Sequence, residues 1–279
     1  MILDPVDPSK RPDVQALARK TSPAGQSLAG RGELACDRRR IDPVLRKLGA
    51  IAVLNAAETQ VVERLTEATE HHRAGAELSA EGAIRSPLAI FSGWACRQRL
   101  FPDGRRQIVD FLLPGDIVGF NIKPGPLETC SIMALTVLQT ANATSLLGAA
   151  LDGIAHPGLA AALAAGPGLE QARLLEQVVR LGRLSAHERT PHLFLELHRR
   201  LSEVGFADQH QFPLPVTQEV LADALSLSIV HINRVLLQLR RERLIEMTGG
   251  RVQILNLPAL AAISQGGAFR SMTGSDGIG

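Results

Sequence analysis

The side chains best suited to recognising another molecule lie near the end of the chain, in the segment LSLSIVHINRVLLQLRR from Leu225 to Arg241. Arg234 can donate two hydrogen bonds to a guanine base or pair with a phosphate, whereas Val230 can only pack, for instance against a thymine methyl group. These groups are suited to holding and reading DNA. The segment therefore predicts a contact surface for nucleic acid, if one element presents these side chains together.

A helix through this segment has two different faces. Wound at 100° per residue, it places four aliphatic residues on one stripe, as in a buried face: Ile232, Val235, Leu236 and Leu239. The opposite side mixes arginine with aliphatic residues: Val230, Arg234, Leu237 and Arg241. Ser228 is placed to cap the first turn. The sequence thus predicts a helix with one core face and one exposed face of mixed chemistry.

A second helix is predicted immediately upstream, in VTQEVLADALSLS, where Thr217 can cap it and Glu219 lies in its first turn. The residues expected between the two helices are small or aliphatic: Leu221, Ala222, Leu225, Leu227, Ile232 and Val235. This spacing predicts a helix-turn-helix. An ordinary helical hairpin shares the apolar spacing, but it has no need of an exposed polar and basic second helix.

The segments around the second helix fit the same interpretation. Ser226 stands in the turn where glycine is common, so the backbone there is accommodated at some steric cost. After the helix, RRERLIEMTGGRVQILNL predicts a strand, a Gly249-Gly250 turn and another strand, as in the wing of a winged helix. Five arginines and two glutamates lie between Arg234 and Arg251, a local excess that attracts phosphate. The residues expected at the DNA are Thr217, Ser228, Ile229, Val230, His231, Asn233 and Arg234.

The rest of the chain must supply a scaffold for this surface. Residues 88–147 show short apolar stretches separated by PDG and PGD, which predict an antiparallel sandwich or barrel. Before it, AAETQVVERLTEATEHHR predicts a helix. After it, the glycines and prolines of HPGLAAALAAGPGLEQ predict a break. A long helix follows, with an apolar seam suited either to a partner helix or to the sandwich behind it: Leu169, Leu175, Val178, Val179 and Leu184. RTPHLFLELHRRLSEVG predicts a further amphipathic helix that Gly205 stops.

Composition limits the classes of protein. The chain has 279 residues, 45% of them hydrophobic, which favours two domains of a soluble protein, and its net charge of +2 does not itself indicate nucleic acid. No apolar run approaches the roughly 20 residues of a membrane span, and the N-terminus lacks the pattern of a secretory signal, so we expect a cytoplasmic protein with no membrane partner. Cys36, Cys96 and Cys130 are far apart, so free thiols are expected.

The segments SGWACR, PDGRRQIVDFLLPGD, LSAHERTPHLFLELHRRL and LSLSIVHINRVLLQLR together resemble the cyclic AMP receptor protein and fumarate-nitrate regulator (CRP/FNR) family of bacterial transcription regulators. The resemblance covers about residues 48–263. It implies an α+β protein that is a homodimer on a palindromic operator in double-stranded DNA, with RNA polymerase as a further partner. The expected regions are a flexible arm (1–44), a β-roll sensor (45–155), a helical dimerisation and linker region (156–205), a winged helix-turn-helix (206–263) and a disordered tail (264–279).

The effector site of the family is altered in this sequence. Members that bind cyclic AMP use a Gly-Glu pair for the ribose and an Arg-Ser pair for the phosphate, but here Phe120 follows Gly119, and Glu128 and Thr129 occupy the Arg-Ser positions. A carboxylate beside a phosphate is repulsive. Cyclic AMP is therefore not the expected effector, the effector is unknown, and no cofactor is expected.

Alternatives from other classes remain open. Cys36 alone cannot replace the N-terminal cysteine cluster of iron-sulfur members, whereas a haem ligated by histidine or cysteine stays an alternative, with His71, His72, Cys96 and Cys130 as the candidates. A metal-dependent β-roll enzyme is the other alternative. It would need clustered histidine and carboxylate ligands on the strands, and the predicted strands contain no histidine.

Overall fold

The computed structural model describes residues 42–81, 86–119 and 130–264. Most of the predicted arm and tail therefore lies outside the described residues. Helix α2 (Pro43–Ile51) begins one residue before the expected end of the arm at residue 44, and the carboxylate of Asp42 caps its first turn. The limits of the five expected regions stay a prediction.

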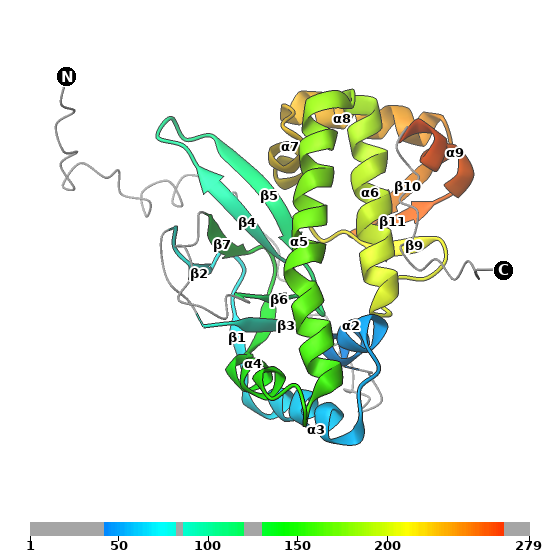
Figure 1. Ribbon diagram of the computed structural model, residues 1–279. Helices are drawn as coiled ribbons and strands as arrows, with labels where there is room; N and C mark the ends of the chain where they lie inside the picture. Colours follow the sequence, from blue (N-terminus) through cyan, green and yellow to red (C-terminus); the bar gives the residue numbers. More distant parts are fainter. Residues whose placement is uncertain (1–41, 82–85, 120–129, 265–279) are drawn as a thin grey trace, which may run out of the picture. The chain divides into compact units, whose positions relative to one another are not determined.

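Two four-stranded antiparallel sheets form the β-roll (Figure 1), and the two turns predicted at PDG and PGD are present. One sheet has the order β1-β8-β3-β6, with bounds Thr69–His72, Leu138–Asn142, Leu88–Ser92 and Ile117–Val118. The other has the order β2-β7-β4-β5, with bounds Glu77–Ser79, Ser131–Ala134, Ala95–Leu100 and Arg106–Leu112. Gly104 and Gly115 take the positive φ values, 86° and 90°, that their turns require. The α+β class is confirmed.

One predicted helix is too long. Helix α3 (Ala56–Leu65) ends eight residues before Arg73, and Thr69–His72 instead forms β1, paired with β8. The reason is that pairing with β8 outweighs the local helical pattern, which no single-chain propensity can anticipate. His71 and His72 therefore lie on a strand, and the expectation that the strands carry no histidine was wrong. The segment after β8 also forms a helix that was not predicted, α4 (Thr144–Leu151).

The predicted break before the long helix was also wrong. Helix α5 runs from Pro157 to Arg183 without interruption, with Pro167 inside it. An internal proline removes one backbone hydrogen bond and costs about 3 kcal/mol. Packing of the part of α5 that precedes Pro167 offsets that cost, because Leu159, Ala162 and Leu163 are buried in the core beneath the β-roll. The buried carboxylate of Glu58 also accepts hydrogen bonds from the first amides of this helix.

Helix α6 (Ala186–Glu203) lies beside α5 (Figure 1) and begins with a capping box formed by Ser185 and Glu188. As predicted, Gly205 follows its end, at a φ of 76°. Its inner face belongs to a cluster of buried side chains that extends from β4 and β5 to the C-terminal helices, with members such as Trp94, Phe194 and Leu221. The β-roll and the C-terminal helices therefore share one hydrophobic core.

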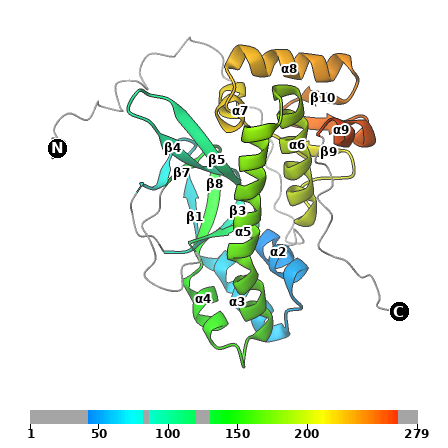
Figure 2. The same cartoon turned by 45° about the horizontal axis from the view of Figure 1, so that its top comes forward.

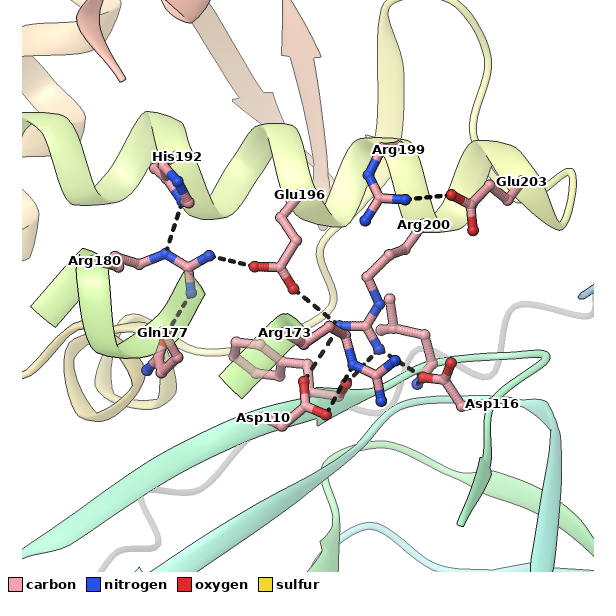
Figure 3. A network of polar contacts seen from close by, with 12 residues as sticks. Asp110, Asp116, Arg173, Gln177, Arg180, His192, Glu196, Arg199, Arg200 and Glu203 are labelled. Atoms are coloured by element: carbon pink, nitrogen blue, oxygen red, sulfur yellow. Dashed lines mark hydrogen bonds and ion pairs between the residues drawn. The ribbon is translucent and has the colours of Figure 1, made fainter. Parts of the chain in front are cut away.

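A buried network of charged groups crosses this core (Figure 3). Arg200 of α6 donates to Asp116 at 2.6 Å, to Asp110 at 3.3 Å and to the backbone carbonyl of Phe111 at 2.7 Å. Arg200 also pairs with Glu196, which in turn pairs with Arg180 of α5. The network therefore ties α5 and α6 to strand β5 and to the turn that follows it.

Burial and neighbouring cations oppose each other in this network. Burial alone would raise the pKa of Asp116, but Arg200, Arg173 and Lys47 hold it at about 2. In the same way burial would raise the pKa of Glu196, and the guanidinium groups of Arg180 and Arg200 lower it. Both carboxyl groups are therefore ionised and paired at neutral pH.

The C-terminal region contains a small sheet of order β10-β11-β9 and three helices. Their bounds are β9 (Gln211–Pro213), α7 (Gln218–Leu225), α8 (Ile229–Arg241), β10 (Ile245–Thr248), β11 (Arg251–Ile254) and α9 (Leu257–Ile263). Strand β9, which the sequence analysis missed, pairs with β11. Among the described residues no single helix is long and apolar enough to cross a membrane, and only α7 and α8 together, bent by 100°, reach such a length and composition.

Candidate DNA-binding surface

Two short helices with side-chain caps build this surface. The hydroxyl of Thr217 accepts a hydrogen bond from Val220 N at 3.2 Å, and that of Ser228 accepts one from His231 N at the same distance. The bend of 100° between α7 and α8 falls within the range of helix-turn-helix motifs. Both predicted caps are therefore confirmed.

The turn between the helices has the backbone that favours glycine. Ser226 lies in the left-handed region, with φ 53° and ψ 47°, and Leu227 N then donates to the carbonyl of Ala222 at 2.9 Å. A residue other than glycine takes this conformation at a cost. The predicted steric cost at Ser226 is thus present in the structure.

The two faces of α8 are as predicted. The aliphatic residues of one stripe are buried against α6, α7 and the small sheet: Ile232, Val235, Leu236 and Leu239. On the other face Val230 is 60% and Leu237 46% exposed. In Figure 2, α8 lies at the edge of the molecule, and the other labelled helices and strands lie on one side of it. All seven residues expected at the DNA are exposed, and six of them lie on or just before α8.

A shallow groove on this face brings together side chains from two helices. Its lining includes Val230, His231 and Arg234 of α8, together with Gln238 and His187. Gln238 donates to Glu242 at 2.8 Å, and the other oxygen of Glu242 lies 3.2 Å from His187 Nε2. Neither Gln238 nor His187 is among the residues predicted from the sequence. Gln238 follows Arg234 by one helical turn and could have been found by that spacing, whereas nothing in the sequence places His187 of α6 beside α8.

The predicted wing is present. Strands β10 and β11 pair in antiparallel register, and Gly249 and Gly250 connect them with φ values of 59° and 72°. Arg251 at the start of β11 is exposed. The wing therefore contributes one exposed cation, and the other exposed arginines of this region lie on α8 or just after it: Arg234, Arg240, Arg241 and Arg243.

Of the predicted effector residues, Gly119 lies among the described residues. Gly119 has a φ of 85°, and a Cβ atom there would lie 3.1 Å from the Cα of Pro87. Glycine is therefore required by the backbone itself, whatever binds nearby. Phe120, Glu128 and Thr129 lie outside the described residues.

The candidates for haem or metal binding are dispersed. His71 is exposed on β1, and His72 contacts the hydroxyl of Thr140 at 2.9 Å. Cys96 is fully buried, which raises the pKa of its thiol to about 12, and neither Cys96 nor Cys130 is in a disulfide. Within the described ranges, no three histidine, cysteine, aspartate or glutamate side chains are grouped so that they could hold a metal ion.

Known proteins share this helix-turn-helix region and most of the chain before it. Residues 188–263 match the model of the Crp-like helix-turn-helix domain. The chain is 29% identical over 224 residues to the nitrogen fixation regulation protein FixK of Bradyrhizobium diazoefficiens, covering 80% of this chain and 92% of that protein. Over most of its length the chain is thus similar to regulators of the CRP/FNR family.

Further relatives are regulators of the same type. The fumarate and nitrate reduction regulatory protein of Vibrio cholerae is 27% identical over 218 residues, covering 76% of this chain and 86% of that protein. The solved structure of FixK2 from Bradyrhizobium japonicum is similar with a TM-score of 0.61 at 26% identity, covering 70% of this chain and 96% of that one. These similarities support a DNA-binding transcription regulator of the CRP/FNR type, and the relatives named here are regulators and not enzymes.

Proposed function

We propose that the protein acts as a homodimer that binds a palindromic operator in double-stranded DNA and regulates transcription there in contact with RNA polymerase. The observation that carries the proposal is the outer face of α8, where Val230 and Arg234 are exposed together above a buried aliphatic stripe. Such a face has no role in the core of this chain. It fits the major groove, which admits a helix and presents both thymine methyl groups and guanine acceptors.

The proposed dimer rests on the second half of α5. Four aliphatic residues on this helix are between 41% and 67% exposed in the single chain: Leu169, Leu175, Val178 and Val179. Leu184, the last residue of the predicted seam, lies just beyond the end of the helix. A row of exposed aliphatic side chains on a long helix is suited to packing against the same row of a second copy.

We expect the protein to sediment as a dimer and to protect two half-sites whose centres are about 34 Å apart, one turn of B-DNA. Leu175→Glu combined with Val178→Glu should yield a monomer, because the seam would then bury unpaired charge. Val53→Glu is the matched control, since Val53 is 93% exposed but lies outside the seam, and it should leave the dimer intact. A wild-type monomer at working concentration, or protection of one isolated half-site, would count against the proposed dimer.

Cyclic AMP and cyclic GMP are proposed not to act as effectors, because Phe120 and Glu128 occupy the positions aligned with ribose and phosphate ligands. An unpaired carboxylate beside a phosphate loses affinity through both desolvation and repulsion. Isothermal titration calorimetry of the full chain with either nucleotide should therefore show no binding in the micromolar range. Micromolar binding of either one by the wild-type protein would contradict this prediction.

The protein is proposed to act in the cytoplasm, as its role in transcription requires. The alternative of a haem-binding sensor has less support, since His71 and His72 point to opposite sides of β1 and Cys96 is buried in the core. Mapping the sites that the protein occupies along a genome would test the proposed function directly, because recovered sites should share one palindrome.

A further inference from the structure

The C-terminal end of α7 is held by side chains from three other elements. The last four carbonyls of a helix lack partners within it. The first of these carbonyls, on Ala222, accepts from the backbone of the turn. The next three accept from side chains: Asp223 O from Gln107 Nε2 at 2.9 Å, Ala224 O from Gln177 Nε2 at 2.8 Å, and Leu225 O from Arg189 Nη1 at 3.0 Å. Strand β5, helix α5 and helix α6 each supply one donor.

Gln107, the donor from the β-roll, is held through both the oxygen and the nitrogen of its side-chain amide. Gln107 Oε1 accepts from the hydroxyl of Ser226 at 2.7 Å, while Nε2 of the same amide donates to Asp223 O. The neighbouring residue Arg106 pairs with the carboxylate of Asp223 at 2.6 Å. Glycine at position 226 would relieve the left-handed backbone but would have no hydroxyl. The serine in the turn therefore connects the helix-turn-helix to the β4–β5 hairpin.

The donor from α5 is oriented by the buried network. Arg180 donates to Oε1 of Gln177, which turns the amide nitrogen toward Ala224 O. Arg180 also pairs with Glu196, and Glu196 with Arg200, which binds Asp116 beyond the end of β5 (Figure 3). An unbroken series of polar contacts thus leads from the turn after β5 to the carbonyl of Ala224.

The donor from α6 joins two helix ends. Arg189 donates to Leu184 O at 2.8 Å and to Leu181 O at 2.9 Å, both at the end of α5, as well as to Leu225 O. A guanidinium group has the several donors in one plane that such triple binding requires, and its positive charge is favourable at the C-terminal end of a helix. Arg189 therefore fixes the end of α7 to the end of α5.

We propose that Gln107, Gln177, Arg189 and Ser226 form a clamp that sets the orientation of the helix-turn-helix relative to the β-roll, so that a displacement of the β4–β5 hairpin is passed to α8 through α7. The clamp leaves the outer face of α8 uncovered. The clamp would therefore change the orientation of α8 and would not block its outer face. The effect of the clamp on operator binding rests on the proposed function. Its mechanical effect, the coupling between the β4–β5 hairpin and α7, does not.

Hydrogen–deuterium exchange of the full chain tests the mechanical part. Gln107→Ala should speed exchange in peptides covering residues 218–228 severalfold, because one helix end loses a partner and Ser226 loses its acceptor. Ser226→Gly should speed exchange in the β4–β5 hairpin, although it relieves the backbone of its own turn. Since both changes remove the same contact, the double variant should exchange no faster in either segment than the faster of the two single variants.

Arg105→Ala is the matched control, because Arg105 lies on the same hairpin but pairs with Asp103 of the hairpin itself. It should leave exchange in α7 unchanged. Unchanged exchange in α7 with Gln107→Ala and in the hairpin with Ser226→Gly would overturn the clamp. If one variant fails to fold, the other still tests the clamp, because Gln107→Ala is measured in α7 and Ser226→Gly in the β4–β5 hairpin.

A DNA measurement separates failure of the clamp from failure of the proposed function. Gln107→Ala should weaken binding to an operator with two half-sites about tenfold and leave binding to a single half-site unchanged. Faster exchange together with no DNA binding by the wild type would support the clamp and refute the proposed function. Equal affinities of variant and wild type for the two-half-site operator would overturn the role of the clamp in presenting α8.

Discussion

Replacing Arg200 by methionine should lower the free energy of unfolding by about 3 to 5 kcal/mol, the usual cost of removing one partner from a buried ion pair. The side chain of Arg200 is 3% exposed and contacts Asp110, Asp116 and Glu196. Without it, three carboxylates lose their shared cation while remaining in the core. Urea denaturation at neutral pH measures the loss.

The neighbouring residue provides the control. Arg199 pairs with Glu203 on the surface of the same helix, with its side chain 43% exposed, so Arg199→Met should cost less than about 1 kcal/mol. Adding Asp116→Asn to Arg200→Met should cost less than the sum of the two single changes, because the second change removes one of the stranded charges. Equal costs for Arg199→Met and Arg200→Met would contradict the assigned role of the network.

The same network gives the stability a defined pH dependence. The pKa of Asp116 is about 2 in the folded protein and 3.8 in its unperturbed state, so the unfolded chain binds the proton more readily. The contribution of this group, about 2 kcal/mol, is therefore present above pH 4 and is lost as the pH falls toward 2. Asp116→Asn should remove that part of the acid dependence.

Changing Arg234 to alanine should relax the preference for one base pair in each half-site by about 1 to 3 kcal/mol. This holds if Arg234 donates two hydrogen bonds to guanine. If it contacts only phosphate, the change should weaken all sequences alike and reduce the salt dependence of binding. Titration against a set of operators with single-base changes distinguishes these outcomes.

Val230→Ala is the companion variant on the same face. It removes apolar contact without leaving a charge unpaired, so its loss should be smaller and confined to operators with thymine at the contacted position. Melting curves serve as the control, because Val230 is 60% exposed and should add little to stability. Unaltered base preference in both variants would refute the claim that this face of α8 reads bases.

The helix-turn-helix could be predicted from the sequence because its signals are local. Thr217 and Ser228 cap the helices, and the buried stripe of α8 follows the period of 3.6 residues within one element. The hairpin turns and the wing were equally accessible, since glycine marks the positive φ of each. Each of these features depends on residues fewer than five positions apart or on a single helix.

Features that depend on distant partners could not be predicted. Thr69–His72 pairs with a strand some 70 residues later, and α5 continues through Pro167 because its first turns are buried under the β-roll. For the same reason the sequence does not show that His187 lines the groove on α8 or that Gln107 contacts the turn at Ser226. The sequence does predict a steric cost at Ser226, where glycine is common, but only the structure shows which group accepts the hydrogen bond from its hydroxyl.

Helix α5 carries two separate sets of constraints, divided near Pro167. Residues before it fill the core beneath the β-roll, so their replacement endangers the fold, whereas Leu175, Val178 and Val179 are largely exposed within the chain. The exposed positions can therefore diverge after gene duplication without loss of the β-roll core. In the proposed dimer, changes at these positions alone would let two duplicated proteins in one cell each pair only with their own copies.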